Sequence, residues 1–156
     1  MASRSSTNKG LSTTRRSAAQ TAALVVSAVF LLVGVLGFIP GVTSDFDAMR
    51  FAGHDSDAKL FGVFQVSVLH NIVHLLFGVA GLILARRAST ARAYLIGGGA
   101  IYLLLWLYGL IVDHGSGANF VPFNSADNWL HLLLGVGMLA VGSLVTARDR
   151  GGADLR

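Results

Sequence analysis

Four long stretches of this chain contain no charged residue. No Asp, Glu, Lys or Arg occurs in residues 17–44, 60–85, 93–112 or 128–147. Each stretch has the roughly 20 residues that an α-helix needs to cross the hydrocarbon core of a bilayer. Only 13% of all residues are charged, against about 25% in soluble domains. The sequence therefore predicts an all-α protein with four transmembrane helices.

Breaking and capping residues set the bounds of these helices. Pro40 and Gly41 should end the first helix, and Ser67 and Asn124 are suited to N-cap the second and fourth. The predicted helices cover residues 18–39, 67–87, 93–112 and 125–148, within one transmembrane domain over 18–148. Residues 1–17 are predicted to be a disordered basic tail, 42–59 a solvated acidic loop, and 149–156 a short tail. The Phe-rich segments before Ser67 and Asn124 are predicted to lie at the membrane interface, or to re-enter the membrane.

The charges are distributed unevenly between the two sides of such a bundle. Ten of the 12 Lys and Arg residues lie before the first helix, between the second and third, or after the fourth. Six of the eight acidic residues fall in the other two loops. The bias of Lys and Arg predicts that both termini are cytoplasmic. The same bias accounts for the net charge of +4, so no nucleic-acid partner is expected. The expected partner of the basic residues is the lipid bilayer.

One motif occurs twice in the sequence. The stretch from His70 to Val79 returns 57 positions later as residues 127–136, with the Asn, His, Leu-Leu, Gly and Val positions in common. The repeat predicts two helical hairpins related by a pseudo-twofold axis along the membrane normal. The second and fourth helices are expected to pair at this axis. Small residues on their shared face are predicted to serve helix packing, namely Gly78, Gly81, Gly135 and Gly142.

Each copy of the motif also places polar side chains four residues apart, hence on one helix face. Ionisable groups are costly in a membrane, so they indicate a function by default. The interpretation that we prefer is a polar clasp, in which hydrogen bonds join the second and fourth helices in a small, non-enzymatic membrane protein. In this interpretation His74 bonds to Asp127 or Asn128, and His131 bonds to His70 or Asn71. The clasp residues are His70, Asn71, His74, Asp127, Asn128 and His131.

Two alternatives stay open. Three imidazoles and a carboxylate (His70, His74, Asp127 and His131) form a credible site for zinc. Two of the histidines, one from each helix, would instead suit a haem b. A small transporter or channel is the second alternative, and it would need to oligomerise. Cysteine is absent, which excludes a thiolate ligand.

The two motif copies resemble the signature stretches of a bacterial membrane family. Residues 69–76 (LHNIVHLL) and 125–133 (SADNWLHLL) are similar to the paired motifs of the family known as domain of unknown function 4383. This family commonly has Asn where the chain has Ser67. The resemblance implies a four-helix, multi-pass protein of the bacterial cytoplasmic membrane and supplies no activity. Its partners would be a second copy or another membrane protein.

Overall fold

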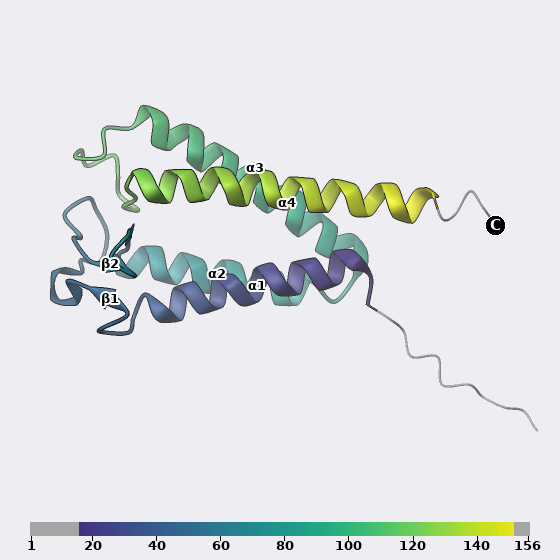
Figure 1. The fold of residues 1–156 in the computed structure, drawn as a ribbon, viewed down its shortest axis with the longest axis horizontal. Helices are drawn as coiled ribbons and strands as arrows, with labels where there is room; N and C mark the ends of the chain where they lie inside the picture. Colours follow the sequence, from purple (N-terminus) through teal and green to yellow (C-terminus); the bar gives the residue numbers. More distant parts are fainter. Residues whose placement is uncertain (1–15, 152–156) are drawn as a thin grey trace, which may run out of the picture.

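The protein is a bundle of four α-helices. A computed structural model describes residues 16–151, with side chains described up to Val145. Its helices are α1 (Ala18–Leu36), α2 (Val68–Leu84), α3 (Ala88–Ile111) and α4 (Ser125–Gly151). Helix α1 packs most extensively on α2, and α3 on α4. Figure 1 shows these two pairs as two layers, with α3 crossing obliquely between them. The predicted four-helix, all-α architecture is confirmed.

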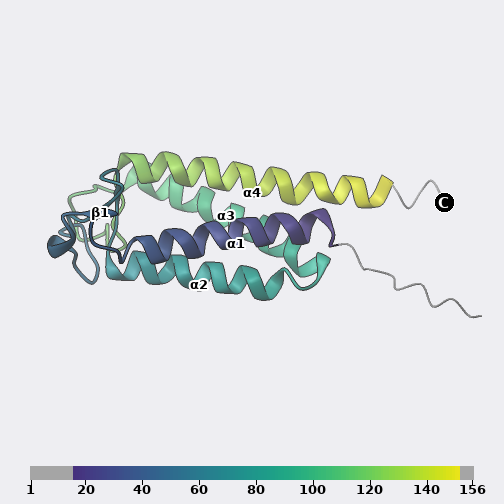
Figure 2. The same ribbon diagram turned by 60° about the horizontal axis from the view of Figure 1, so that its bottom comes forward.

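The chain connections gather at the two ends of the bundle (Figure 2). The start of α1, the short α2–α3 connection and the end of α4 lie together, and we call this the tail end. The segments 37–67 and 112–124 lie together at the opposite end, which we call the loop end. The predicted tail over residues 1–17 falls almost entirely outside the described residues, as does the stretch 152–156.

Three of the helices are long and apolar enough to cross a membrane. They are α1, α3 and the part of α4 from Ser125 to Val145. Helix α2 is equally apolar but has 17 residues, hence a length of about 26 Å. That is slightly less than the roughly 30 Å hydrocarbon core. The molecule therefore has the character of a membrane protein, with α2 as its shortest helix.

Local interactions explain where the helices begin and end. A capping box between Ser17 and Gln20 begins α1. This helix ends at Leu36, three residues before the predicted end, and the Thr43 hydroxyl donates to the carbonyl oxygens of Leu36 and Gly37. Helix α3 begins at Ala88 rather than at 93, because a helix can start with Arg92 in its first turns at the membrane surface. Helix α4 continues past residue 148 to Gly151.

The loop end contains a small sheet that the sequence did not predict. Its strands β1 (Thr43–Ser44), β2 (Lys59–Leu60) and β3 (Phe64–Gln65) pair antiparallel in the order β1-β2-β3, with a 3₁₀ turn η1 (Phe46–Ala48) between the first two. Ala58, Leu60 and Val66 are buried beneath it. Residues 42–59 are thus only partly a solvated loop. Strands of two residues are too short for a periodic pattern to reveal them.

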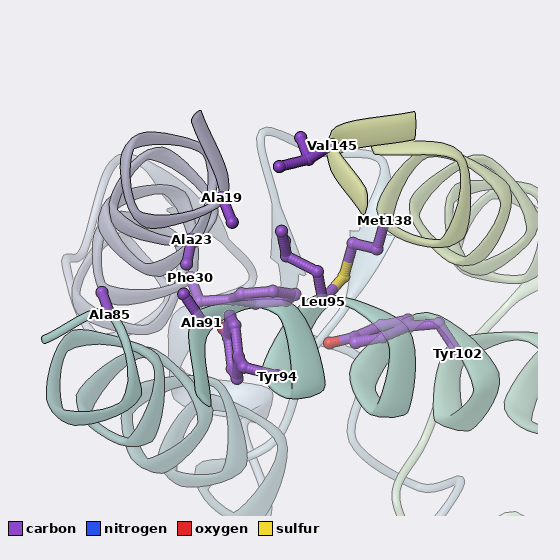
Figure 3. Close-up of a cluster of buried hydrophobic side chains, with 10 residues drawn as sticks. All are labelled: Ala19, Ala23, Phe30, Ala85, Ala91, Tyr94, Leu95, Tyr102, Met138 and Val145. Atoms are coloured by element: carbon purple, nitrogen blue, oxygen red, sulfur yellow. The ribbon is translucent and has the colours of Figure 1, made fainter. Parts of the chain in front are cut away.

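The main hydrophobic core lies between the two layers. Figure 3 shows Leu95 of α3 directed between α1 and α4, beside Met138. Rings of Phe30, Phe77 and Tyr102 meet in the same cluster, with Phe30 and Tyr102 stacked at a centroid distance of 5.4 Å. Side chains from α1, α3 and α4 therefore join the two hairpins through their centre.

The glycines of α2 and α4 face the partner helix of their own hairpin. A Cβ atom at Gly78 would lie 2.7 Å from Leu31 Cγ on α1. A Cβ at Gly135 would lie 2.7 Å from Leu103 Cδ2 on α3. Gly81 likewise approaches α1, and Gly142 approaches α3. The expectation that α2 and α4 pair along an axis was therefore wrong. The small residues bring each helix close to its hairpin neighbour, and the pairs α1–α2 and α3–α4 dominate the packing.

This packing predicts that substitution by alanine changes the stability differently at two glycines of α4 that are two positions apart. Gly135→Ala should destabilise the protein by about 1–3 kcal/mol, because the added methyl group overpacks the contact with Leu103. Gly137→Ala should have little effect, since nothing lies within 4 Å of a Cβ built there. Reversible unfolding of the purified protein in mixed micelles measures both. Equal losses for the two variants would contradict this packing.

Candidate functional site

The six clasp residues are all buried at the loop end. Their exposed fractions range from 1% for Asn71 to 8% for His74. They come from the first two turns of α2 and of α4, so the structure does bring the two motif copies to the same end of the bundle. The members of this polar cluster are His70, Asn71 and His74 of α2, and Asp127, Asn128 and His131 of α4.

Capping interactions hold the start of each of these helices. The Ser67 hydroxyl accepts a hydrogen bond from His70 N at 3.1 Å, as its N-cap position predicts. Asn124 Oδ1 accepts from the backbone N–H groups of Ala126 and Asp127. The Asp127 carboxylate reaches back to accept from Asn124 N at 2.9 Å. The start of α4 is therefore a capping box in which aspartate stands at the third position.

Two hydrogen bonds join the hairpins at matching positions of the repeat. His70 Nδ1 lies 3.0 Å from Pro122 O, and Gln65 N donates to Asp127 Oδ2 at 2.9 Å. Residues 65 and 122 are 57 positions apart, as are residues 70 and 127. Each hairpin thus uses its leading motif residue to bind the segment that precedes the other motif.

The chemistry of residues 65 and 122 explains why a histidine and an aspartate stand at the leading position. Gln65 has a backbone N–H, and Asp127 accepts it. Pro122 has no N–H and offers only its carbonyl oxygen, so the opposing residue must donate. His70 does so through Nδ1. The leading residue of each motif copy is therefore matched to its partner: Asp127 accepts from an N–H group, and His70 donates to a carbonyl oxygen.

Two further hydrogen bonds connect the same segments. Asn124 Nδ2 donates to Val63 O at 2.7 Å, and Gly53 N donates to Phe120 O at 2.7 Å. Together with the two bonds above, they link residues 53–70 to residues 120–127. We call these four hydrogen bonds the loop-end brace. Five of the eight groups in these bonds are backbone groups of loop or strand residues, and the sequence did not predict them. The equivalent positions of Gln65 and Pro122, 57 residues apart, are the sequence signal for two of these groups.

The three imidazoles lie among aromatic rings. The His70 and His74 rings stack with a centroid distance of 4.6 Å and an interplanar angle of 23°. His74 also meets Phe30, and His131 meets the rings of Tyr102 and Phe123 at 5.3 and 5.5 Å. Phe30 and Tyr102 come from α1 and α3, so all four helices surround the cluster.

The particular hydrogen bonds of the predicted clasp are not formed. His74 Nδ1 bonds to His70 O within its own helix, at 3.0 Å. Asn71 packs against Gly37 and Asn128 packs against Gly109, so each amide faces the partner helix of its own hairpin. Within the described residues, Asn71 Nδ2, Asn128 Oδ1 and His131 Nδ1 are buried without a hydrogen-bond partner. The loop-end brace joins the hairpins instead.

Two small cavities flank the imidazoles. One, of about 70 Å³, is lined by Asp127 and by apolar side chains of α1, α4 and the sheet. The other, of about 50 Å³, lies toward α3 and is lined by Tyr102 and Phe123. His70, His74 and His131 line both. Among the described side chains, which end at Val145, no three of His, Asp or Glu are placed to hold a metal ion together. The zinc and haem alternatives therefore gain no support from this geometry, and metal and haem analysis of the protein in mild detergent tests them.

Two substitutions of Asp127 should separate its charge from its role as an acceptor. Asp127→Asn retains a carbonyl oxygen for the N–H groups of Gln65 and Asn124, so it should cost little stability. Asp127→Leu has a similar shape but no acceptor, and it should cost about 1–3 kcal/mol for each backbone donor left unsatisfied. Reversible unfolding in micelles measures the difference. If the two variants were equally stable, the two hydrogen bonds would not be holding the loop end.

Comparison with known proteins agrees with the resemblance of the motifs. The family described as Domain of unknown function (DUF4383) matches residues 20–144, which include α2, α3, most of α1 and α4, and the whole polar cluster. No curated protein and no solved structure matches the chain. With a match over most of its length, the chain belongs to the DUF4383 family.

Proposed function

We propose that this protein is a small, non-enzymatic integral membrane scaffold, built from two copies of a helical hairpin that the loop-end brace holds together. Its rigid apolar faces would pack against a second copy or another membrane protein. The observation that carries the proposal is the reciprocal pair of bonds, His70 to Pro122 and Gln65 to Asp127. Both cross from one hairpin to the other, and both lie at the loop end.

Contacts within the hairpins support the proposed duplication. Leu31 packs over Gly78 in the first hairpin, and Leu103 packs over Gly135 in the second. Asn71 likewise packs against Gly37, and Asn128 against Gly109. In both comparisons the α2 and α4 residues are 57 positions apart, and the α1 and α3 residues are 72 apart. Two independent contacts with the same pair of offsets favour a repeat over coincidence.

The membrane topology is the second element of the proposal. Helix α2 lies alongside α1 over its length, so it would cross the membrane with α1 despite its 17 residues. Basic residues at the tail end, including Arg16, Arg86 and Arg87, favour a cytoplasmic location for that end. The loop end would face the other side, in a bacterial cytoplasmic membrane.

The proposed bracing predicts a change in the distance between the two loop segments. Spin labels at Phe51→Cys and Phe120→Cys are suitable, because both side chains are exposed and the chain has no native cysteine. Pulsed electron paramagnetic resonance should give a narrow distance distribution. Adding His70→Phe and Asp127→Leu should broaden it, because two of the four bonds of the loop-end brace, His70–Pro122 and Gln65–Asp127, are lost while the side-chain volume is kept.

A matched control is available on the same loop. His54→Gln should leave the distribution narrow, because the His54 imidazole pairs with its neighbour Asp55, at 3.2 Å, and the His54 carbonyl oxygen that accepts from Gln65 Nε2 is kept in the variant. A distribution that stays narrow when both His70 and Asp127 are replaced would overturn the bracing role.

The proposed orientation predicts the accessibility of single cysteines in whole cells. A cysteine at position 54, at the loop end, should react with a membrane-impermeant maleimide added outside. A cysteine at position 89, at the start of α3, should react only after the membrane is opened. The reverse pattern would place the loop end in the cytoplasm.

A further inference from the structure

The 70 Å³ cavity beside Asp127 offers hydrogen-bond acceptors in an otherwise apolar wall. Its polar lining consists of His70, His74, His131 and Asp127 alone, and no Lys or Arg lines it. The remaining lining residues are apolar and include Phe61 and Phe64. A ligand here would meet lone pairs, a carboxylate and aromatic faces.

The hydrogen bonds of the first two histidines decide which of their nitrogen atoms is free. A carbonyl oxygen can only accept, so Nδ1 of His70 carries the proton that it donates to Pro122 O. Nδ1 of His74 carries the proton that it donates to His70 O. In the neutral ring Nε2 is then a bare acceptor. No donor among the described side chains and backbone groups reaches Nε2 of either ring.

His131 is unpartnered at the same place. Its side chain is 6% exposed, and its buried Nδ1 has no hydrogen-bond partner within the described part of the chain. A buried polar group without a partner is costly, and a bound molecule would remove that cost. His131 lines both cavities, so its ring would border a molecule bound in either one.

The charge of the site favours a cation. Asp127 Oδ2 already accepts two backbone N–H groups, and no basic side chain lines the cavity. Burial disfavours the ionised form of a carboxyl group, and a bound cation would supply the partner that this form lacks. Aromatic rings attract a cation through their faces, and Phe61 and Phe64 also line the cavity. A metal ion would need several lone pairs directed at one point, and no such group of three exists in residues 16–151.

We propose that this cavity binds a small ammonium-type cation, either ammonium itself or a short primary amine. Its N–H groups would donate to Nε2 of His70 and His74, and its charge would lie beside Asp127. A bare alkali ion and a quaternary ammonium ion have no N–H to donate, so neither would bind in this way. This goes beyond the bracing role, which requires no ligand.

The test uses the full-length protein in mild detergent at constant pH and ionic strength. Ammonium chloride or methylammonium chloride should raise the melting temperature saturably, because a ligand that binds only the folded state stabilises it. Sodium chloride and tetramethylammonium chloride should not. Equal shifts with all four salts would overturn the proposal. A shift with zinc chloride and none with ammonium would replace it with a metal site.

Two variants test the assigned groups without relying on loss of folding. Asp127→Asn keeps an acceptor for both backbone donors, and His74→Phe keeps a ring between His70 and Phe30. Each should fold and should weaken ammonium binding at least tenfold, whereas His54→Gln should bind as the wild type does. Undiminished binding in both site variants would overturn the assignment. Spin-label distances do not require ammonium, so failure of the ligand proposal and failure of the bracing proposal are distinguishable.

Discussion

The structure depends on a reciprocal pair of hydrogen bonds between the hairpins. In each bond, a backbone group just before α2 or α4 meets a side chain in the first turn of the other helix. Residue 65 offers an N–H and meets a carboxylate, whereas residue 122 is a proline, offers only a carbonyl, and meets an imidazole N–H. Near the apolar part of a membrane, an unpaired backbone group costs several kcal/mol. Each of these bonds therefore satisfies a backbone group just before the second helix of one hairpin and joins that hairpin to the other. The small sheet and the caps of α2 and α4 surround this exchange.

Helix packing and the loop-end brace stabilise different parts of the structure. Glycines allow α2 to approach α1, and α4 to approach α3, closely enough for leucine and asparagine side chains to fill the contact. Van der Waals contact of this kind is the main force between helices in lipid. It explains how each hairpin forms but says little about how two hairpins are joined. The hydrophobic cluster around Leu95 joins them at the centre (Figure 3), and the brace joins them at the loop end.

The polar cluster consequently has two parts with different roles. His70 and Asp127 take part in cross-hairpin bonds, and Asn71 and Asn128 pack inside their own hairpins. His74 and His131 remain with nitrogen atoms that no described residue uses. A bound molecule that forms hydrogen bonds with these nitrogen atoms would explain why they are buried without a partner in an apolar protein.

The sequence by itself determined the number of helices, their apolar character and the capping of α2 and α4. These properties depend on residues close together in the chain: runs without charge, and Ser67 and Asn124 before helical motifs. It also indicated that His70 and Asp127 hold equivalent places. Only the tertiary structure decided what they bind, because Pro122 O and Gln65 N belong to the opposite hairpin. The glycine stripes show the same division. A stripe of small residues marks a face for close packing, but Gly78 and Gly135 are equally suited to either neighbour, and only the assembled bundle selects α1 and α3.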